Sequence, residues 1–253
     1  MKPVTVAIVG AGAVGSTIAY TLLMRNLAST ILLVDIAQKK CRGEVLDLLD
    51  ARMFSDVHDI RAGTLRDAGQ ADIIIIAAGV PQKPGQSRSE LLATNQVVVR
   101  SIIEGMGSFR SDLIIIVVTN PVDVLTFLVQ KISGLPRSHI FGSGTLLDTD
   151  RLRRCVGESI GIDPRSVDLF VLGEHGESQF VAWSTATIAG APLIEFPGFS
   201  REACAEYADA ARKRVYEIIE CKGATAFGVA ACVASYCVDV IFDTKRITPV
   251  SCY

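Results

Sequence analysis

The chain has 253 residues, a formal net charge of −2, 49% hydrophobic residues and 21% charged residues. These figures are those of an ordinary globular protein, with enough material for one large domain or two modest ones. The near-neutral charge, with no basic run, gives no indication of a nucleic-acid partner. Seven cysteines without a short-spaced pattern, and three histidines far apart, argue against a disulfide scaffold and a structural metal site. Reduced thiols are typical of a cytoplasmic protein.

The first part of the chain has no charged residue between Lys2 and Arg25, a length that fits a signal peptide or a membrane span. Glycines at positions 10, 12 and 15 interrupt this stretch. A buried strand, a glycine turn and a buried helix explain the same residues. We therefore expect no membrane segment here.

Strand-like and helix-like segments alternate along the first half of the chain. The runs at 73–77 and 113–118 are apolar throughout, which is typical of parallel strands buried on both faces. The expected strands are 4–9, 31–34, 73–77, 113–118 and 139–141, and the expected helices are 14–27, 39–54, 88–106 and 122–132. This alternation predicts βαβ units with right-handed crossovers, and hence a doubly wound parallel sheet of the Rossmann type.

The pattern changes near residues 142–144, where we place a domain boundary. We expect a dinucleotide-binding (Rossmann) domain over 1–142 and a mixed α+β substrate domain over 143–253. The second domain is expected to contain helices at 147–157, 201–220 and 225–242 and strands at 167–172 and 183–188.

A glycine-rich turn links the first expected strand to the first expected helix. Its sequence is Gly10-Ala11-Gly12-Ala13-Val14-Gly15. Glycines allow a tight turn and a close approach of the backbone to a pyrophosphate, which the N-terminus of the following helix attracts. Asp35 ends the second strand, where a carboxylate can accept hydrogen bonds from both ribose hydroxyls of NAD and would repel the 2′-phosphate of NADP. We therefore predict an NAD site, although Asp35 alone could be a helix cap.

Four further segments carry unusual polar residues. They are 79–88 (GVPQKPGQSR), 119–121 (TNP), 142–151 (GSGTLLDTDR) and 173–178 (GEHGES). Together with the glycine turn they resemble the lactate/malate dehydrogenase family, and the resemblance runs in the family's order from Val4 to the last residue. It implies a Rossmann domain, a mobile loop that closes over the substrate, and a mixed α/β substrate domain. The implied reaction is reversible hydride transfer between NADH and a 2-oxo acid.

The resemblance implies chemical roles for four residues. His175 would give a proton to the carbonyl oxygen, and Asp148 would hold the histidine tautomer and stabilise its imidazolium form. Arg151, three residues after Asp148 on one helix face, would bind the substrate carboxylate with two parallel hydrogen bonds. Arg88, at the end of the Pro/Gly loop, would reach the carbonyl when the loop closes and excludes water.

Each of these four residues has a plainer explanation when it is considered alone. His175 could be a loop or core histidine, and Asp148 could be a cap in the first turn of its helix. Arg151 could form a surface ion pair, and Arg88 could be a solvated arginine at a helix start. The matching segments favour the functional explanation.

Further contacts are also implied by the resemblance. Asn120 would bind the substrate or the nicotinamide ribose, and Thr225 would contact the substrate. Val229, one helical turn later, would form an apolar wall for the nicotinamide. Gly79 and Ser101 are expected as additional cofactor contacts, and no metal is expected.

Gln82 decides the expected substrate. Relatives that are specific for malate resemble this loop but carry arginine at this place, which would neutralise the second carboxylate of oxaloacetate. Gln82 has no charge, so a dicarboxylate would enter unpaired and partly desolvated. We therefore expect pyruvate, reduced to (S)-lactate, with a malate or another 2-hydroxy-acid dehydrogenase as the alternative. A short-chain dehydrogenase would need Tyr-x-x-x-Lys, which the sequence lacks.

Two features depart from the family's pattern. Family members that bind fructose 1,6-bisphosphate use a pair of basic residues. Arg153 matches one residue of this pair, but Asp168 stands where the other residue is usually histidine. We therefore expect little activation by this sugar bisphosphate. The sequence stops at Tyr253, whereas family members continue for some tens of residues. We expect an incomplete substrate domain, and an NAD-binding module without turnover is the alternative from another class. The resemblance also predicts a homotetramer in the cytoplasm, with no nucleic-acid or membrane partner.

Overall fold

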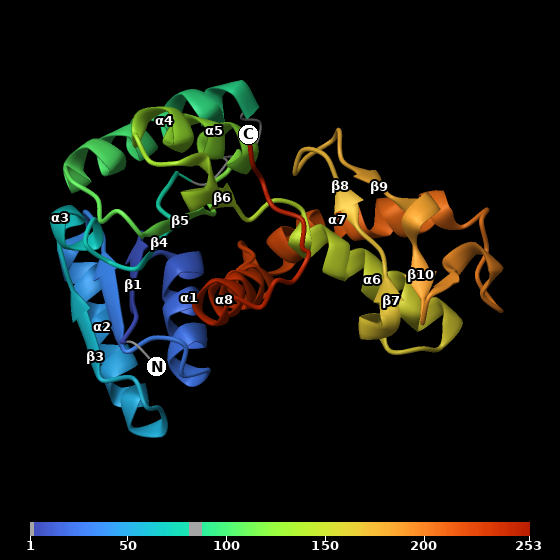
Figure 1. Ribbon diagram of the computed structural model, residues 1–253, viewed down its shortest axis with the longest axis horizontal. Coiled ribbons are helices and arrows are strands. Elements are labelled where there is room, and N and C mark those ends of the chain that lie inside the picture. Colours follow the sequence, from blue (N-terminus) through green and yellow to red (C-terminus); the bar gives the residue numbers. More distant parts are fainter. Residues whose placement is uncertain (1–2, 81–87) are drawn as a thin grey trace. The chain divides into compact units, whose positions relative to one another are not determined.

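The computed structural model describes residues 3–80 and 88–253, with side chains from residue 90 onward in the second range (Figure 1). These residues form two compact units. The first contains the chain up to Ser143 together with Ala226–Arg246 and Ser251–Tyr253, and the second contains Gly144–Thr225 and Ile247–Val250. Among the described residues, no helix combines the length and the apolar character that a membrane span needs.

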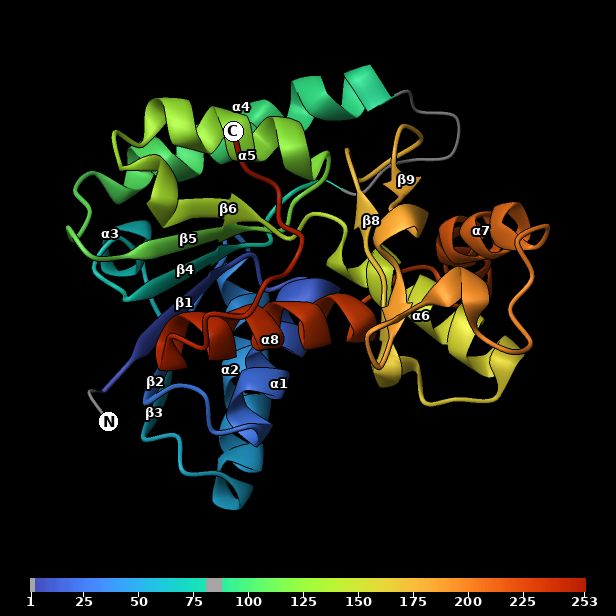
Figure 2. The ribbon, with the colours of Figure 1, turned by 45° about the vertical axis from the view of Figure 1, so that its right-hand side comes forward.

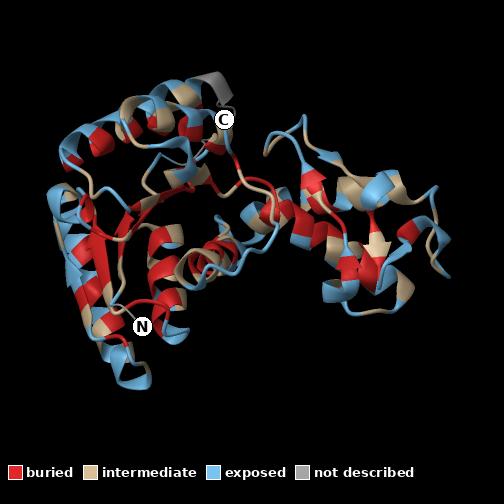
Figure 3. Cartoon of the chain, in the orientation of Figure 1, coloured by how far each residue is buried: buried red, intermediate tan, exposed pale blue. Residues whose placement is uncertain are grey.

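A six-stranded parallel sheet forms the centre of the first unit, in the order β3-β2-β1-β4-β5-β6. Its strands are β1 (Thr5–Val9), β2 (Thr30–Val34), β3 (Asp59–Ala62), β4 (Ile73–Ile76), β5 (Ile114–Val117) and β6 (Ile140–Gly142). This order is that of a doubly wound Rossmann sheet and confirms the predicted fold class. β4 is a run of buried isoleucines, and Figure 3 shows burial along the central strands, because helices cover both faces.

The edge strand β3 is absent from the sequence prediction. It pairs with β2 in parallel register, with Ile60 beside Ile31. Ile60 is its one buried residue, while Arg61 and Ala62 are exposed. An edge strand with a single buried side chain has no apolar run, so the pattern that predicts the other strands cannot detect it.

Helices cover the two faces of this sheet. They are α1 (Ala13–Met24), α2 (Gln38–Ala51), α3 (Leu65–Ala68), α4 (Arg88–Met106), α5 (Val122–Ile132) and α8 (Phe227–Phe242), with the 3-10 turns η1 (Arg52–Phe54) and η2 (Arg137–His139). Figure 2 shows α4 and α5 on one face and α1 and α8 on the other. Val99 of α4 and Leu125 of α5 join alternate strand residues such as Ile74 and Ile115 in one apolar cluster.

Helix α8 packs on α1 and therefore belongs to the first unit, although nearly all of the second unit precedes it in the sequence. The two compact units therefore do not follow one another along the chain, whereas the sequence pattern predicts a single boundary after residue 142. The reason is that α8 buries residues such as Ala230 and Val233 completely, and an apolar helix of this kind needs the cover of the large sheet domain.

The last residues of the chain also contact the first unit. Ser251 and Gly142 exchange two backbone hydrogen bonds of 2.9 and 3.0 Å.

The second unit combines two long helices with short strands. Its elements are α6 (Leu146–Ile160), η3 (Pro164–Ser166), β7 (Val167–Asp168), β8 (Val171–Leu172), β9 (Phe180–Val181), η4 (Trp183–Thr185), β10 (Thr187–Ile188), β11 (Ala191–Pro192), η5 (Leu193–Glu195) and α7 (Cys204–Lys222). One sheet has the order β11-β10-β7, and β8 pairs with β9. Residues 167–172, expected as one strand, are divided between the two sheets, and at the break the carbonyl oxygen of Leu169 accepts a hydrogen bond from Nε of Arg153 on α6.

The core of the second unit lies between α6 and these strands. Leu152 and Val156 of α6 are fully buried with Val167, Leu169 and Val171. Since α6 also packs on α7, only part of its surface is exposed. Polar side chains on its buried faces therefore need partners within the unit.

Candidate active site

The glycine turn between β1 and α1 leaves little room for side chains. Gly10 has a φ of +105°, and a Cβ atom there would lie 2.5 Å from the backbone nitrogen of Ala78. A Cβ atom on Gly15 would lie 1.8 Å from the carbonyl oxygen of Gly10. Gly12, the N-cap of α1, has open space instead, because a Cβ atom there would meet no atom within 4 Å. The turn is therefore open at the N-terminus of α1, where backbone N–H groups can bind an anionic group.

Asp35 comes directly after β2 and binds the glycine turn. Its Oδ2 accepts a hydrogen bond of 2.7 Å from the backbone N–H of Ala11, and its Oδ1 accepts one of 2.8 Å from the N–H of Ala37. The side chain is half-buried. A carboxylate has about four acceptor sites, so Asp35 can support the turn and still accept hydrogen bonds from ligand hydroxyl groups.

Asn95 on α4 joins the ends of two neighbouring strands. Its Oδ1 accepts a hydrogen bond of 2.8 Å from the N–H of Val80, and its Nδ2 donates one of 2.8 Å to the carbonyl oxygen of Asn120. Asn95 is 2% exposed, so these hydrogen bonds are shielded from water. A Cβ atom on Gly79 would lie 2.4 Å from Cγ2 of Thr119. The segments after β4 and β5 are thus held together at the carboxyl edge of the sheet, where open α/β sheets bind ligands.

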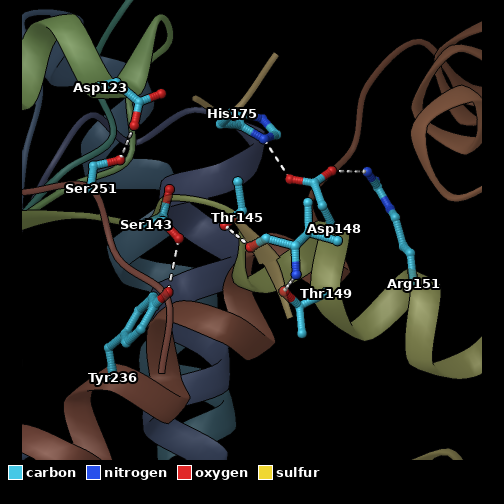
Figure 4. A network of polar contacts seen from close by, with 10 residues as sticks. Asp123, Ser143, Thr145, Asp148, Thr149, Arg151, His175, Tyr236 and Ser251 are labelled. Carbon is cyan, nitrogen blue, oxygen red and sulfur yellow. Dashed lines mark hydrogen bonds and ion pairs between the residues drawn. The ribbon is translucent and has the colours of Figure 1, made fainter. Parts of the chain in front are cut away.

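Asp148 lies between His175 and Arg151 (Figure 4). Nδ1 of His175 is 2.6 Å from Oδ2 of Asp148, and Nη1 of Arg151 is 3.5 Å from Oδ1. Asp148 is 3% exposed and Arg151 is 9% exposed, so this is a buried ion pair and not a surface one. Because an ionised carboxylate only accepts hydrogen bonds, Nδ1 of His175 is the donor. Nε2 is then the ring nitrogen that can exchange a proton with a ligand.

The remaining expected site residues lie on several elements. Ser101 is exposed on α4, and its Oγ donates a hydrogen bond of 2.8 Å within its own helix. Val229 is half-buried on α8 of the first unit, and Thr225 is half-buried at the end of the second unit. Gln82 lies outside the described residues, and Arg88 begins α4 without a described side chain.

Family models match the chain on both sides of the expected boundary. The model of the lactate/malate dehydrogenase NAD-binding domain matches residues 4–142, and the model of the α/β C-terminal domain of the same family matches residues 145–253. The chain belongs to the lactate/malate dehydrogenase family. The resemblance indicated by the sequence motifs is therefore confirmed over nearly the full chain.

Individual members of the lactate/malate dehydrogenase family are similar along the whole chain. L-lactate dehydrogenase A of Rhizopus oryzae is 46% identical over 98% of this chain and 77% of that protein, and L-lactate dehydrogenase of Pediococcus acidilactici is 39% identical over 98% of this chain and 78% of that protein. Among solved structures, the minor L-lactate dehydrogenase of Enterococcus mundtii has a TM-score of 0.95 and 36% identity, covering 100% of this chain and 82% of that one. A lactate dehydrogenase from a deep-sea metagenome has a TM-score of 0.94 and 35% identity over the same shares.

NAD is the cofactor of this family, and the residues present fit it. A side chain at Gly12 would fill the space in front of the helix N-terminus, and its absence leaves room for a pyrophosphate. Val14, half-buried in the first turn of α1, completes the motif. The acceptor capacity of Asp35 at the end of β2 suits ribose hydroxyl groups.

Arg153 and Asp168 are the two residues at which the sequence predicts a departure from a basic effector-binding pair. Here Nη2 of Arg153 is 3.3 Å from Oδ1 of Asp168. Nε of Arg153 donates a hydrogen bond of 2.8 Å to the carbonyl oxygen of Leu169, and the guanidinium lies 4.9 Å from the ring centroid of Phe170. These contacts already occupy donors of the Arg153 guanidinium, and little activation by a sugar bisphosphate stays a prediction.

Sequence reasoning missed several buried polar residues, among them Asn95, Thr145 and Thr149. For Asn95 a signal exists, since it falls in the apolar stripe formed by Leu91 and Val99 at spacings of four on α4. A polar residue at such a position predicts a buried hydrogen-bond network. The partners of Thr145 and Thr149 are backbone groups of a distant strand, which no sequence pattern reveals.

Proposed function

We propose that this chain is an NAD-dependent L-lactate dehydrogenase that reduces pyruvate reversibly to (S)-lactate. The observation that carries the proposal is the 2.6 Å contact between Nδ1 of His175 and the buried Asp148, with Arg151 on the same helix. Relatives named L-lactate dehydrogenase, 39% and 46% identical to this chain, support it. When bound, the nicotinamide of NADH supplies the hydride that reduces the carbonyl carbon.

His175 is the proton donor in this proposal. Its Nδ1–H donates to Asp148, so the proton for the carbonyl oxygen leaves from Nε2. The carboxylate of Asp148 fixes the orientation of the ring and stabilises the imidazolium form. In the reverse direction, neutral His175 accepts the hydroxyl proton of lactate. Pyruvate therefore binds to the protonated histidine and lactate to the neutral one.

Arg151 holds the carboxylate of the substrate. A guanidinium has five N–H donors, so it can interact with Asp148 and still bind a carboxylate with two parallel hydrogen bonds. The rigid position of Arg151 on α6, at 9% exposure, favours one orientation of the substrate. In this proposal, that orientation would bring the carbonyl oxygen toward His175.

The loop residues complete the proposed substrate site by resemblance to the family. Arg88 would stabilise the charge that develops on the carbonyl oxygen when the loop closes. Gln82 would leave the methyl group of pyruvate without a charged neighbour, and Asn120 and Thr225 would contact the substrate.

We assign cofactor binding to the domain over 1–142 together with Val229 of α8, which belongs to the first compact unit, and substrate binding to the rest of the domain over 143–253. The proposed NAD contacts are Gly10, Gly12, Val14, Gly15, Asp35, Gly79, Ser101, Asn120 and Val229. We further propose a homotetramer in the cytoplasm, as the family resemblance implies.

One assay tests the proposal. NADH oxidation is followed with pyruvate, with oxaloacetate and with 2-oxobutyrate, and NADH binding is measured separately by fluorescence. We expect the highest kcat/KM with pyruvate. A preference for oxaloacetate would make the chain a malate dehydrogenase, and NADH binding without turnover of any 2-oxo acid would make it an NAD-binding module.

A further inference from the structure

Strand β8 has one open edge, and it faces α6. On its other side β8 pairs with β9, where Val171 lies opposite Val181 and the N–H of Ala182 donates to the carbonyl oxygen of Phe170. Neighbouring residues of a strand point their backbone groups to opposite edges. The N–H and C=O groups of Val171 therefore point away from β9. Val171 is 2% exposed, so both groups need partners within the protein.

Side chains of α6 and of its N-cap residue supply these partners. Oγ1 of Thr145 donates a hydrogen bond of 2.6 Å to the carbonyl oxygen of Val171, and the N–H of Val171 donates one of 2.9 Å to Oγ1 of Thr149 (Figure 4). Nε of Arg153 donates one of 2.8 Å to the carbonyl oxygen of Leu169. We call Thr145, Thr149 and Arg153 the α6 clamp.

The spacing of the α6 clamp matches the strand. Its members are four residues apart, so they form one stripe on the helix. Four helical residues rise about 6 Å, and two strand residues span about 6.6 Å. Thr149 and Arg153 therefore reach backbone groups of Val171 and Leu169, which lie two residues apart on one edge.

The hydroxyl groups of Thr145 and Thr149 both form hydrogen bonds with β8. Thr145 is 3% exposed and Thr149 is fully buried, so water cannot replace a lost partner. Thr145 is the N-cap residue of α6, yet its side chain makes no capping hydrogen bond. A threonine at this position would ordinarily cap the helix, and here it holds β8 instead.

The hydrogen bonds of the clamp lie close in sequence to the Asp148–His175 pair on both segments of the chain. Asp148 lies between Thr145 and Thr149 in one turn of α6, and His175 follows Val171 by four residues. The register of β8 on α6 therefore decides where Nδ1 of His175 meets Oδ2 of Asp148. At 2.6 Å this hydrogen bond tolerates only a small shift, because N–H···O distances in proteins extend to about 3.2 Å and the bond weakens steeply at angles below about 120°.

We propose that the α6 clamp positions His175 against Asp148 and thereby sets the turnover rate, which makes Thr145, Thr149 and Arg153 positioning residues. The clamp acts through β8 and not through contact with the reacting atoms. The inference rests on the proposed function for its effect on turnover, and on geometry alone for its effect on the His175 imidazole.

The test compares Thr149→Val, which keeps the shape and removes the hydroxyl, with Thr149→Ser, which keeps the hydroxyl. Thr126→Val is the matched control: Thr126 is equally buried, but its hydroxyl donates to Val122 within α5 of the first unit. For each folded variant, kcat and KM for pyruvate and the Kd for NADH are measured. Protein labelled with 15N-histidine should also give a low-field imidazole Nδ1–H signal, to be assigned to His175 by its loss in His175→Asn.

We expect Thr149→Val to lower kcat by roughly 10- to 100-fold, as misplacements of about 1 Å do, with NADH affinity unchanged and the His175 signal shifted or lost. Thr149→Ser should stay within about threefold of wild type, and Thr126→Val should match wild type. Because Thr145 and Thr149 bind one residue, the double variant should lose much less than the product of the single effects. If Thr149→Val does not fold, the same measurements on Thr145→Val and Thr145→Ser test the clamp, with the same expected difference between them.

If Thr149→Val folds, keeps the wild-type kcat and leaves the His175 signal unchanged, the proposal that the α6 clamp positions His175 is wrong. The imidazole signal is read without substrate, so it judges the clamp even if the wild-type chain fails to reduce pyruvate. In that case the proposed function is wrong, and a shifted signal still supports the positioning role.

Discussion

The backbone N–H of Ala11 donates a hydrogen bond of 2.7 Å to Oδ2 of Asp35, so the carboxylate after β2 is joined to the glycine turn after β1. One side chain thus serves both the proposed ribose contact and the shape of the pyrophosphate turn. Changes at Asp35 should therefore affect cofactor affinity as well as cofactor choice.

We expect Asp35→Ser to reduce the preference for NADH over NADPH by roughly tenfold or more, because it removes the negative charge that would face a 2′-phosphate. Affinity for NADH should fall too, since Ala11 loses an acceptor. Asp35→Asn is the control, because it removes the charge and keeps an acceptor oxygen. The measurement is kcat/KM with each cofactor, and equal values for the wild-type chain would refute the role of Asp35.

Gly12→Ala should separate cofactor binding from folding. The added Cβ would meet no atom within 4 Å, and the φ of −81° at Gly12 suits alanine. The fold should therefore be kept, while the Kd for NADH should rise by roughly tenfold or more if the pyrophosphate approaches this backbone. Gly43→Ala on α2 is the matched control, because its Cβ also meets no atom within 4 Å. Unchanged NADH affinity in Gly12→Ala would place the pyrophosphate elsewhere.

His175→Asn should lower kcat for pyruvate by roughly 10²- to 10⁴-fold and leave NADH binding intact, since the proton donor is removed. Asp148→Asn should lower kcat as well, because the imidazolium loses its carboxylate partner at 2.6 Å. In the wild-type chain, pyruvate affinity should fall as the pH rises and the imidazolium is lost, while lactate affinity should show the opposite trend. A His175→Asn variant with near-normal turnover would exclude His175 as the proton donor.

Gln82→Arg should shift the preference from pyruvate toward oxaloacetate. The new guanidinium would pair with the second carboxylate, and close charge pairs of this kind are worth roughly several kcal/mol, or a change of several orders of magnitude in relative kcat/KM. Gln82→Lys tests whether charge alone is sufficient without the planar fork of arginine. If the ratio of the two efficiencies stays at the wild-type value, residue 82 does not face the substrate.

Cys237 should make the fold sensitive to alkali. It is fully buried on α8, and burial raises the pKa of its thiol from 9.0 to about 12, with Arg25 acting in the opposite direction. Below pH 9 both states keep the proton and the stabilisation is complete. As the pH rises from about 9 toward 12, only the unfolded chain loses the proton, so the free energy of unfolding should fall by up to about 1.4 kcal/mol per pH unit.

Urea denaturation between pH 8 and 10.5 measures this slope. Cys237→Ala should be less stable at neutral pH because of the cavity, but its stability should decline less steeply in alkali. Cys221→Ala removes an exposed thiol on α7 and should keep the wild-type slope. Parallel slopes for wild type and Cys237→Ala would show that the buried thiol is not the cause.

Sequence patterns predict this fold best where burial is complete. Every strand of the parallel sheet except β3 is expected, because short β-branched runs such as Ile73–Ile76 are typical of parallel strands buried on both faces. The pairing of His175 with Asp148 is also foreseen, but only through family motifs, since the two residues are far apart in the sequence. The hydrogen bonds from Thr145 and Thr149 to β8 are missed, because they depend on the register of a strand that periodicity does not specify.

The position of α8 on α1 has a consequence for biosynthesis. The ribosome completes the whole stretch from Gly144 to Thr225 before α8 emerges. At ~5–20 residues per second, the nascent sheet domain waits on the order of ten seconds with the α1 surface bare. We therefore expect the nascent chain to need chaperone protection on this surface, and the NAD site to mature only after translation has passed Phe242.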